Sequence, residues 1–125
     1  MATILVVDDE EVLCDLMQQE LSYYGHEVLI ATGGRKGIEL FTQHRPHLTL
    51  LDLRMPQMSG IEVLKRIRAL DPQARVIILT GGGTEVWEKQ ARELGVTEFL
   101  RKEVSLKDLV GSLGKALQGT NTSQL

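Results

Sequence analysis

The sequence predicts an α/β domain built on a five-stranded parallel sheet with helices on both faces. Five short segments, most of them almost continuously apolar, alternate with five segments of helical periodicity; the expected strands are 4–7, 27–31, 47–52, 75–80 and 97–100. Short apolar runs of this kind are typical of strands buried on both faces of a parallel sheet. Regular alternation implies right-handed crossovers, which place helices on each side of the sheet. The pattern alone leaves the order of the strands open.

The first half of the chain carries two helix patterns and the residues that end them. The first helix, expected over 10–24, has apolar residues at helical spacing and ends at Gly25, in the manner of a glycine that closes a helix. The second helix is expected over 36–44, and Pro46 separates it from the third strand.

Capping signals mark the helices of the second half. Ser59, with Glu62 three positions later, predicts a capping box for a helix that runs through Ala69. A fourth helix is expected over 84–94 and is closed by Gly95.

The last helix and the tail set the expected boundaries of the domain. Ser105, with Asp108 three positions later, caps a helix whose apolar stripe runs to Leu117. The residues that follow are polar and without periodicity, so we assign 1–118 to one domain and 119–125 to a polar tail or the start of a linker.

Length, composition and charge exclude several classes of protein. A chain of 125 residues fits one domain, and 42% apolar with 25% charged residues are ordinary globular values, unlike those of disordered or fibrous chains. The net charge of −3 gives no general attraction to nucleic acid or to anionic lipid. We therefore expect no direct contact with nucleic acid and none with a membrane.

The single cysteine and the absence of targeting signals predict the compartment. Cys14 has no second cysteine with which to form an internal disulfide, and its position suggests a buried thiol in a reducing environment. No apolar stretch reaches the ~20 residues that span a bilayer, and there is no signal-peptide pattern. The protein is expected to be soluble and cytoplasmic.

Polar side chains stand where four of the expected strands end. Asp8 and Asp9 follow the first strand, Asp52 and Thr80 close the third and fourth strands, and Lys102 follows the fifth. The carboxyl ends of parallel strands form the crevice where ligands bind. Three carboxylates, a hydroxyl and an ammonium on one rim can bind a divalent cation and a phosphoryl group. This combination indicates a phospho-accepting signalling domain.

Each of these residues also has a plainer interpretation. Asp8 or Asp9 could simply cap the helix that follows, whereas Asp52 ends a buried run, where a surface cap is not expected. Thr80 and Lys102 carry little information singly, and the combination carries the hypothesis. Carboxylates brought together at strand ends repel unless a cation neutralises them, and oxygen ligands favour Mg²⁺.

Together, these residues resemble the receiver domain of bacterial two-component response regulators over about residues 3–118. The resemblance is carried by Asp8-Asp9, by Asp52-Leu-Arg-Met-Pro56 with Gly60 beyond it, by Thr80 followed by Gly81, by Lys102, and by Phe99 three residues before the lysine.

The resemblance implies a flavodoxin-like fold with strand order 2-1-3-4-5 and a phosphoacceptor at Asp52. The donor would be the phosphohistidine of a sensor histidine kinase or a phosphotransfer protein. Asp9 and Asp52 would ligate Mg²⁺ directly with the backbone carbonyl of Arg54, while Asp8 would act mainly through water.

The resemblance also implies a switch. Lys102 would bind the phosphoryl group, and the Thr80 hydroxyl would be drawn toward it, so that Phe99 rotates inward. The surface of the fourth helix, fifth strand and fifth helix would then change and control an output domain or a downstream protein. A phosphorylation-dependent homodimer is a further partner that the resemblance implies. Such a domain is a signalling switch, and its only catalysis is its own phosphorylation and slow dephosphorylation.

One position departs from the family pattern, which usually has a cis Lys-Pro peptide after the fifth strand. Here Glu103 follows Lys102. A cis bond before a residue other than proline costs about 2.5–4 kcal/mol, so we expect this peptide to be trans.

Two other functions remain as alternatives. A phosphohydrolase of the haloacid-dehalogenase type would also use an aspartyl phosphate, but it places an acid two residues after the nucleophile, where this chain has Arg54. A pseudo-receiver would bind a partner without being phosphorylated.

Overall fold

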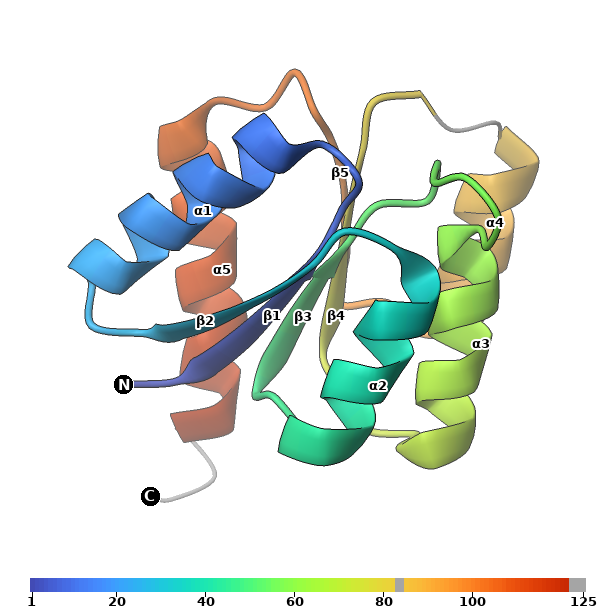
Figure 1. Ribbon diagram of the computed structural model, residues 1–125, viewed down its shortest axis with the longest axis horizontal. Coiled ribbons are helices and arrows are strands. Elements are labelled where there is room, and N and C mark those ends of the chain that lie inside the picture. The colour runs from blue at the N-terminus through green and yellow to red at the C-terminus, as the bar shows by residue number, and fades with distance from the viewer. Residues whose placement is uncertain (83–84, 122–125) are drawn as a thin grey trace.

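A computed structural model, which describes residues 1–82 and 85–121, contains one parallel sheet flanked by helices (Figure 1). The strands are β1 (Thr3–Val7), β2 (Glu27–Ala31), β3 (Leu48–Leu51), β4 (Val76–Thr80) and β5 (Glu98–Arg101). The helices are α1 (Glu11–Tyr23), α2 (Gly34–His44), α3 (Gly60–Leu70), α4 (Glu85–Glu93) and α5 (Leu106–Asn121). The predicted start of the fourth helix at Thr84, and most of the predicted tail, lie outside the described residues.

The five strands are ordered β2-β1-β3-β4-β5, and every pair is parallel. This order confirms the flavodoxin-like topology that the family resemblance implied. Helices α1 and α5 cover one face of the sheet, and α2, α3 and α4 cover the other (Figure 1). The central strands β1, β3 and β4 are therefore buried on both faces, which explains their continuous apolar runs.

Alternate residues of each strand contribute to two separate cores. In β1, Ile4 and Val6 pack with the apolar residues of α1 and α5, whereas Leu5 and Val7 pack with those of α2, α3 and α4. The two-residue period of a strand thus supplies both layers of the core from one short run. None of the helices in the described part of the chain is long and apolar enough to cross a membrane.

The predicted caps are present. The Ser59 hydroxyl accepts a hydrogen bond from the backbone N–H of Glu62 at 3.3 Å, and Ser105 accepts one from Asp108 at 3.1 Å. These bonds satisfy N–H groups that have no partner within the first turn of a helix. Gly25 takes a φ of +86°, the left-handed conformation that favours glycine after a helix.

Two helix ends differ from the prediction by two residues or more, and the other differences in the described helices are of one residue. Helix α2 begins at Gly34, two residues before the expected start, because Gly34 and Arg35 have no apolar side chains to mark the helical face. Helix α5 continues to Asn121, past the boundary expected at 118. Polar residues extend a helix without adding to its apolar stripe, so periodicity does not reveal them.

Gly60 lets the loop after β3 fold back onto the end of that strand. Its backbone N–H donates to the carbonyl of Leu53 at 2.9 Å. A Cβ atom at this position would overlap the carbonyl oxygen of Asp52 and lie 2.6 Å from the Cα of Leu53. Both obstacles are backbone atoms, which cannot rotate away. Only glycine fits this close approach.

We expect Gly60→Ala to lower the free energy of unfolding by about 3 kcal/mol or more, because overpacking against backbone forces the loop to move. Gly114→Ala is the matched control. Gly114 lies exposed within α5, and a Cβ there meets no atom within 4 Å. That change should raise the free energy of unfolding by up to about 1 kcal/mol through helix propensity. Urea unfolding measures both, and equal effects would contradict the assigned contact.

Candidate functional site

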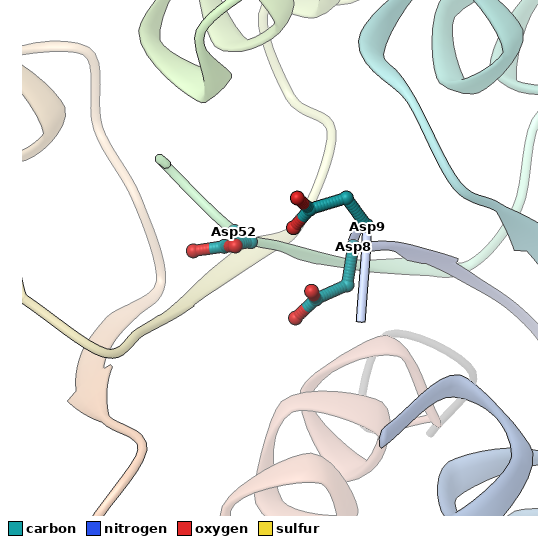
Figure 2. A group of neighbouring side chains, drawn as sticks. All are labelled: Asp8, Asp9 and Asp52. Atoms are coloured by element: carbon teal, nitrogen blue, oxygen red, sulfur yellow. The ribbon is translucent and has the colours of Figure 1, made fainter. Parts of the chain in front are cut away.

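Three aspartates gather at the carboxyl edge of the sheet, at the ends of β1 and β3 (Figure 2). Carboxylate oxygens from Asp8, Asp9 and Asp52 all lie within 4.8 Å of one another. Asp8 and Asp52 are only 2% and 3% exposed, whereas Asp9 lies at the surface. The structure therefore brings together the three carboxylates that the sequence predicted at one rim.

The backbone of the two buried aspartates extends the hydrogen bonding of the sheet. The N–H of Asp8 donates to Ala31 at 3.0 Å, and that of Asp52 donates to Val7 at 2.9 Å. Each residue is therefore fixed relative to the neighbouring strand although it lies beyond the assigned strand end.

Each of these carboxylates also accepts a hydrogen bond from the backbone two residues further on. Asp8 Oδ1 accepts from the N–H of Glu10 at 2.9 Å, and Asp52 Oδ1 accepts from that of Arg54 at 3.2 Å. Such local turns hold one oxygen of each side chain in place. The N-cap residue of α1 is Glu10, whose side chain makes no capping bond, so the simple helix-cap interpretation of Asp8 or Asp9 is wrong.

The buried carboxyl groups have raised pKa values. Burial raises the pKa of Asp8 to about 6; the Asp52 charge adds to this rise, while the Glu10 N–H and the Lys102 ammonium oppose it. Burial also raises the pKa of Asp52, and here the Lys102 charge and the Arg54 N–H act in the opposite direction. Desolvation disfavours a carboxylate unless a positive charge compensates it.

Lys102 supplies part of that positive charge. Its Nζ lies 3.1 Å from Asp8 Oδ2 and 3.5 Å from Asp52 Oδ2, and it also bonds Glu10 Oε1. Burial lowers the pKa of Lys102, but the hydrogen bonds to Glu10 and Asp8 outweigh that effect, so the pKa lies above its ordinary value. The described chain contains no cis peptide, so the 102–103 bond is trans, as predicted.

Thr80 and Phe99 lie on adjacent strands beside the carboxylates. Thr80 is fully buried, and its hydroxyl lies close enough to Asp52 to lower the pKa of that carboxyl, but without the geometry of a hydrogen bond. Phe99 is half-buried and packs toward the α2, α3 and α4 side. Its ring is flanked by the guanidinium groups of Arg92 at 5.7 Å and Arg101 at 6.0 Å.

Small residues leave room around the site. A Cβ on Gly81 would lie 3.4 Å from Cδ of Lys102, and one on Gly82 would lie 3.4 Å from Nη1 of Arg54. The glycines after β4 therefore border the lysine stem and the Arg54 side chain.

The sequence interpretation missed Glu10 as a site residue. It was expected only as an acid in the first turn of a helix, yet its carboxylate contacts the Lys102 ammonium. No local pattern distinguishes Glu10 from its neighbour Glu11, because the partner is far away along the chain.

The arrangement suits a hard divalent cation. In the described part of the chain, Asp8, Asp9 and Asp52 form the group of oxygen ligands close enough to share an ion, and the two buried members are costly to ionise without one. Carboxylate oxygens are the ligands that Mg²⁺ prefers. The residues therefore fit Mg²⁺, the ion that the sequence analysis predicted for this site.

Comparisons with known proteins agree with the fold. The family model described as the response regulator receiver domain matches residues 4–113. The uncharacterized transcriptional regulatory protein YkoG of Bacillus subtilis is 33% identical over 98% of this chain, which spans only 54% of that protein. Sporulation initiation phosphotransferase F of the same species is 32% identical, with 91% of this chain and 92% of that protein covered.

A solved structure shows the same fold. The response regulator receiver domain protein (CheY-like) from Methanospirillum hungatei superposes with a TM-score of 0.94 over 98% of both chains, at 27% identity. The chain therefore belongs to the response regulator receiver domain family, as the sequence predicted. Domains of this family are signalling switches and in general not enzymes.

The raised pKa of Asp8 makes the metal-free protein less stable as pH rises. A carboxyl whose pKa is raised on folding stabilises the folded state below its ordinary value of 3.8 and loses that contribution as pH passes about 6. We expect Asp8→Asn to remove this loss and to raise the metal-free free energy of unfolding at neutral pH by on the order of 2–3 kcal/mol.

Urea unfolding in a chelator, between about pH 4 and 7, measures this effect. Asp15→Asn, at an exposed position of α1, is the control and should leave the pH dependence unchanged. Asp52, whose pKa is also raised, keeps its own contribution in this variant, so an Asp8→Asn protein that loses as much stability over this range as the wild type would show that Asp8 does not contribute.

Proposed function

We propose that this receiver domain accepts a phosphoryl group on Asp52 in an Mg²⁺-dependent reaction. The donor is the phosphohistidine of a sensor histidine kinase or of a phosphotransfer protein. The observation that carries the proposal is the position of the buried Asp52 carboxylate, with two carboxylates within 4.8 Å and the Lys102 ammonium at 3.5 Å. An acceptor, a set of metal ligands and a cation for the incoming oxygens thus share one rim.

In the proposed reaction, an Asp52 oxygen attacks phosphorus. The bond from phosphorus to the donor nitrogen breaks, and its electron pair stays on that nitrogen. The hydrogen bond from the Arg54 N–H to Oδ1 fixes the orientation of the carboxylate during the attack. Phosphoryl transfer depends chiefly on positioning and on neutralising negative charge, and the Lys102 ammonium supplies part of that neutralisation.

Asp8, Asp9, Asp52 and the backbone carbonyl of Arg54 would hold the metal ion. When bound, Mg²⁺ supplies positive charge to the carboxylates and to the oxygens of the phosphoryl group. Asp8 is buried beside Lys102, whereas Asp9 is exposed, so Asp9 is free to turn toward an ion without breaking a contact with the lysine.

Thr80 is the proposed start of the conformational switch. Among the described residues, no group lies in hydrogen-bonding geometry with its buried hydroxyl. A buried hydroxyl without a partner is costly, and a phosphoryl oxygen on Asp52 would relieve that cost. The Thr80 carbonyl also accepts from the N–H of Lys102 at 2.9 Å, so movement at Thr80 reaches β5 directly.

The proposed output surface is formed by α4, β5 and α5, with Phe99 as the switch aromatic. A cytoplasmic location, an output domain or downstream protein, and a phosphorylation-dependent homodimer belong to the same proposal. The two relatives illustrate two contexts, since this chain spans about half of the transcriptional regulatory protein and nearly all of the sporulation phosphotransferase.

Phosphorylation should require Asp52. With Mg²⁺ and acetyl phosphate, the wild type should gain a phosphoryl group by intact mass, and Asp52→Asn should gain none because its amide is not a nucleophile. Asp15→Asn, which removes an exposed carboxylate of α1, should be labelled like the wild type. Labelling of Asp52→Asn would contradict the assignment, and an unlabelled wild type would favour the pseudo-receiver.

Mg²⁺ affinity should depend on Asp9. Removing one carboxylate from the group should weaken binding at least about tenfold, because its charge lies within a few ångström of the ion. Calorimetry of Asp9→Ala measures this, with Glu11→Ala as a control at an exposed acid outside the group. Equal affinities in the two variants would remove Asp9 from the ligand set.

A further inference from the structure

Glu10, at the start of α1, contacts the site through its side chain. It occupies the N-cap position of that helix with an extended backbone, and its side chain is 60% exposed. Its carboxylate reaches the Lys102 ammonium, which comes from the opposite end of the chain and is 18% exposed. The contact therefore joins the start of α1 to the loop after β5.

Three carboxylates share the Lys102 ammonium unequally. Glu10 contacts the ammonium, Asp8 lies at 3.1 Å, and Asp52 lies at 3.5 Å, the outer limit of a hydrogen bond. An ammonium has three N–H donors, so these carboxylates can occupy all of them. The lysine is thus held more closely by Glu10 and Asp8, between β1 and α1, than by the proposed acceptor Asp52.

We propose that Glu10 is a positioning residue that competes with the phosphoryl group on Asp52 for the Lys102 ammonium. The competition slows phosphorylation and weakens the phosphorylated state. This inference rests on the proposed function, because it assumes that Asp52 carries the phosphoryl group. Glu10 is thus a fourth carboxylate at the site, outside the metal-ligand group, and it limits how readily the Lys102 ammonium can bind the phosphoryl group.

Glu10 differs from Asp8 in its relation to the metal ligands. Asp8 belongs to the group of oxygens that can share a cation, whereas Glu10 lies outside it. A cation held by that group would neutralise part of the negative charge of Asp8. Glu10 would then be the remaining carboxylate that competes for Lys102. Because Glu10 is exposed, water can replace its contact, so the competition is modest in size.

The test compares Glu10→Gln with Glu11→Gln, which removes the same charge from the next, exposed residue. The probe is beryllofluoride with Mg²⁺, which stands in for the phosphoryl group on Asp52. Binding is followed by the fluorescence of Trp87, with calorimetry as a second readout. Glu10→Gln should bind about threefold to fivefold more tightly than the wild type, the size expected for an exposed ion pair. Its initial rate of labelling by acetyl phosphate should rise by a similar factor.

A second pair of variants separates the contact from a general effect of charge. In a Lys102→Ala background, Glu10→Gln should change beryllofluoride affinity no more than Glu11→Gln does, because the shared ammonium is gone. Thermal unfolding of each variant verifies that the domain remains folded.

The outcomes distinguish the two levels of the proposal. A wild type that neither binds beryllofluoride nor accepts a phosphoryl group would refute the proposed function itself. A wild type that does both, with Glu10→Gln equal to Glu11→Gln, would overturn only the competition. Weaker binding by Glu10→Gln, or a gain that persists without Lys102, would overturn it as well.

Discussion

The site depends on the ion pairs of the Lys102 ammonium, because they allow the buried carboxylates of Asp8 and Asp52 to lie close together. Asp8 and Asp52 end neighbouring strands and are almost fully buried, an arrangement that is unfavourable for two negative charges. In the order β2-β1-β3-β4-β5, the lysine starts at the edge strand and must pass β4 to reach them. Strands lie about 4.8 Å apart, so only a long side chain spans that distance. Gly81 after β4 leaves space for the lysine stem.

The two edges of the sheet are held in different ways. At the amino edge, the Arg68 guanidinium of α3 donates to the carbonyls of Ala74 at 2.7 Å, Leu94 at 2.6 Å and Gly95 at 2.8 Å. These bonds fasten the end of α4 to α3 and to the start of β4. At the carboxyl edge, by contrast, buried carboxylates have raised pKa values, and the Thr80 hydroxyl has no hydrogen-bond partner within residues 1–82 and 85–121. A ligand at the carboxyl edge can relieve these unfavourable contacts.

Local patterns predicted the elements of the fold and most of the site, and long-range contacts account for what they missed. Ser59 and Ser105 cap their helices because the bond spans only three residues, which the sequence displays directly. The aspartates were predictable because a strand delivers its next residue to a shared edge. The contact of Glu10 with Lys102 joins residues 92 apart and leaves no such pattern.

The role of Gly60 was also hidden, although the residue itself was noted, because its obstacle is the backbone of another segment. Arg101 and Lys102 are both positively charged, so charge alone did not predict which of them is the cation of the site. The structure separates them, since Arg101 lies against Glu88 at 3.3 Å while Lys102 enters the site. Side chains alternate between the two sides along β5, so adjacent residues point in opposite directions. Which of Arg101 and Lys102 faces the carboxylates therefore depends on where the strand ends.

The relative strength of the contacts around Phe99 indicates why the proposed switch can operate. Glu88 of α4 pairs with Arg92 at 3.0 Å and with Arg101 at 3.3 Å, and both arginines flank the aromatic ring. These ion pairs are largely exposed, and such pairs contribute about 0–1 kcal/mol each. Giving the buried Thr80 hydroxyl a partner relieves about 1–3 kcal/mol. In the proposed switch, a phosphoryl oxygen that bound Thr80 would gain enough free energy to offset the loss of one or two of these pairs. Because Thr80 lies opposite Arg101 in the sheet, the gain arises next to the contacts that must change.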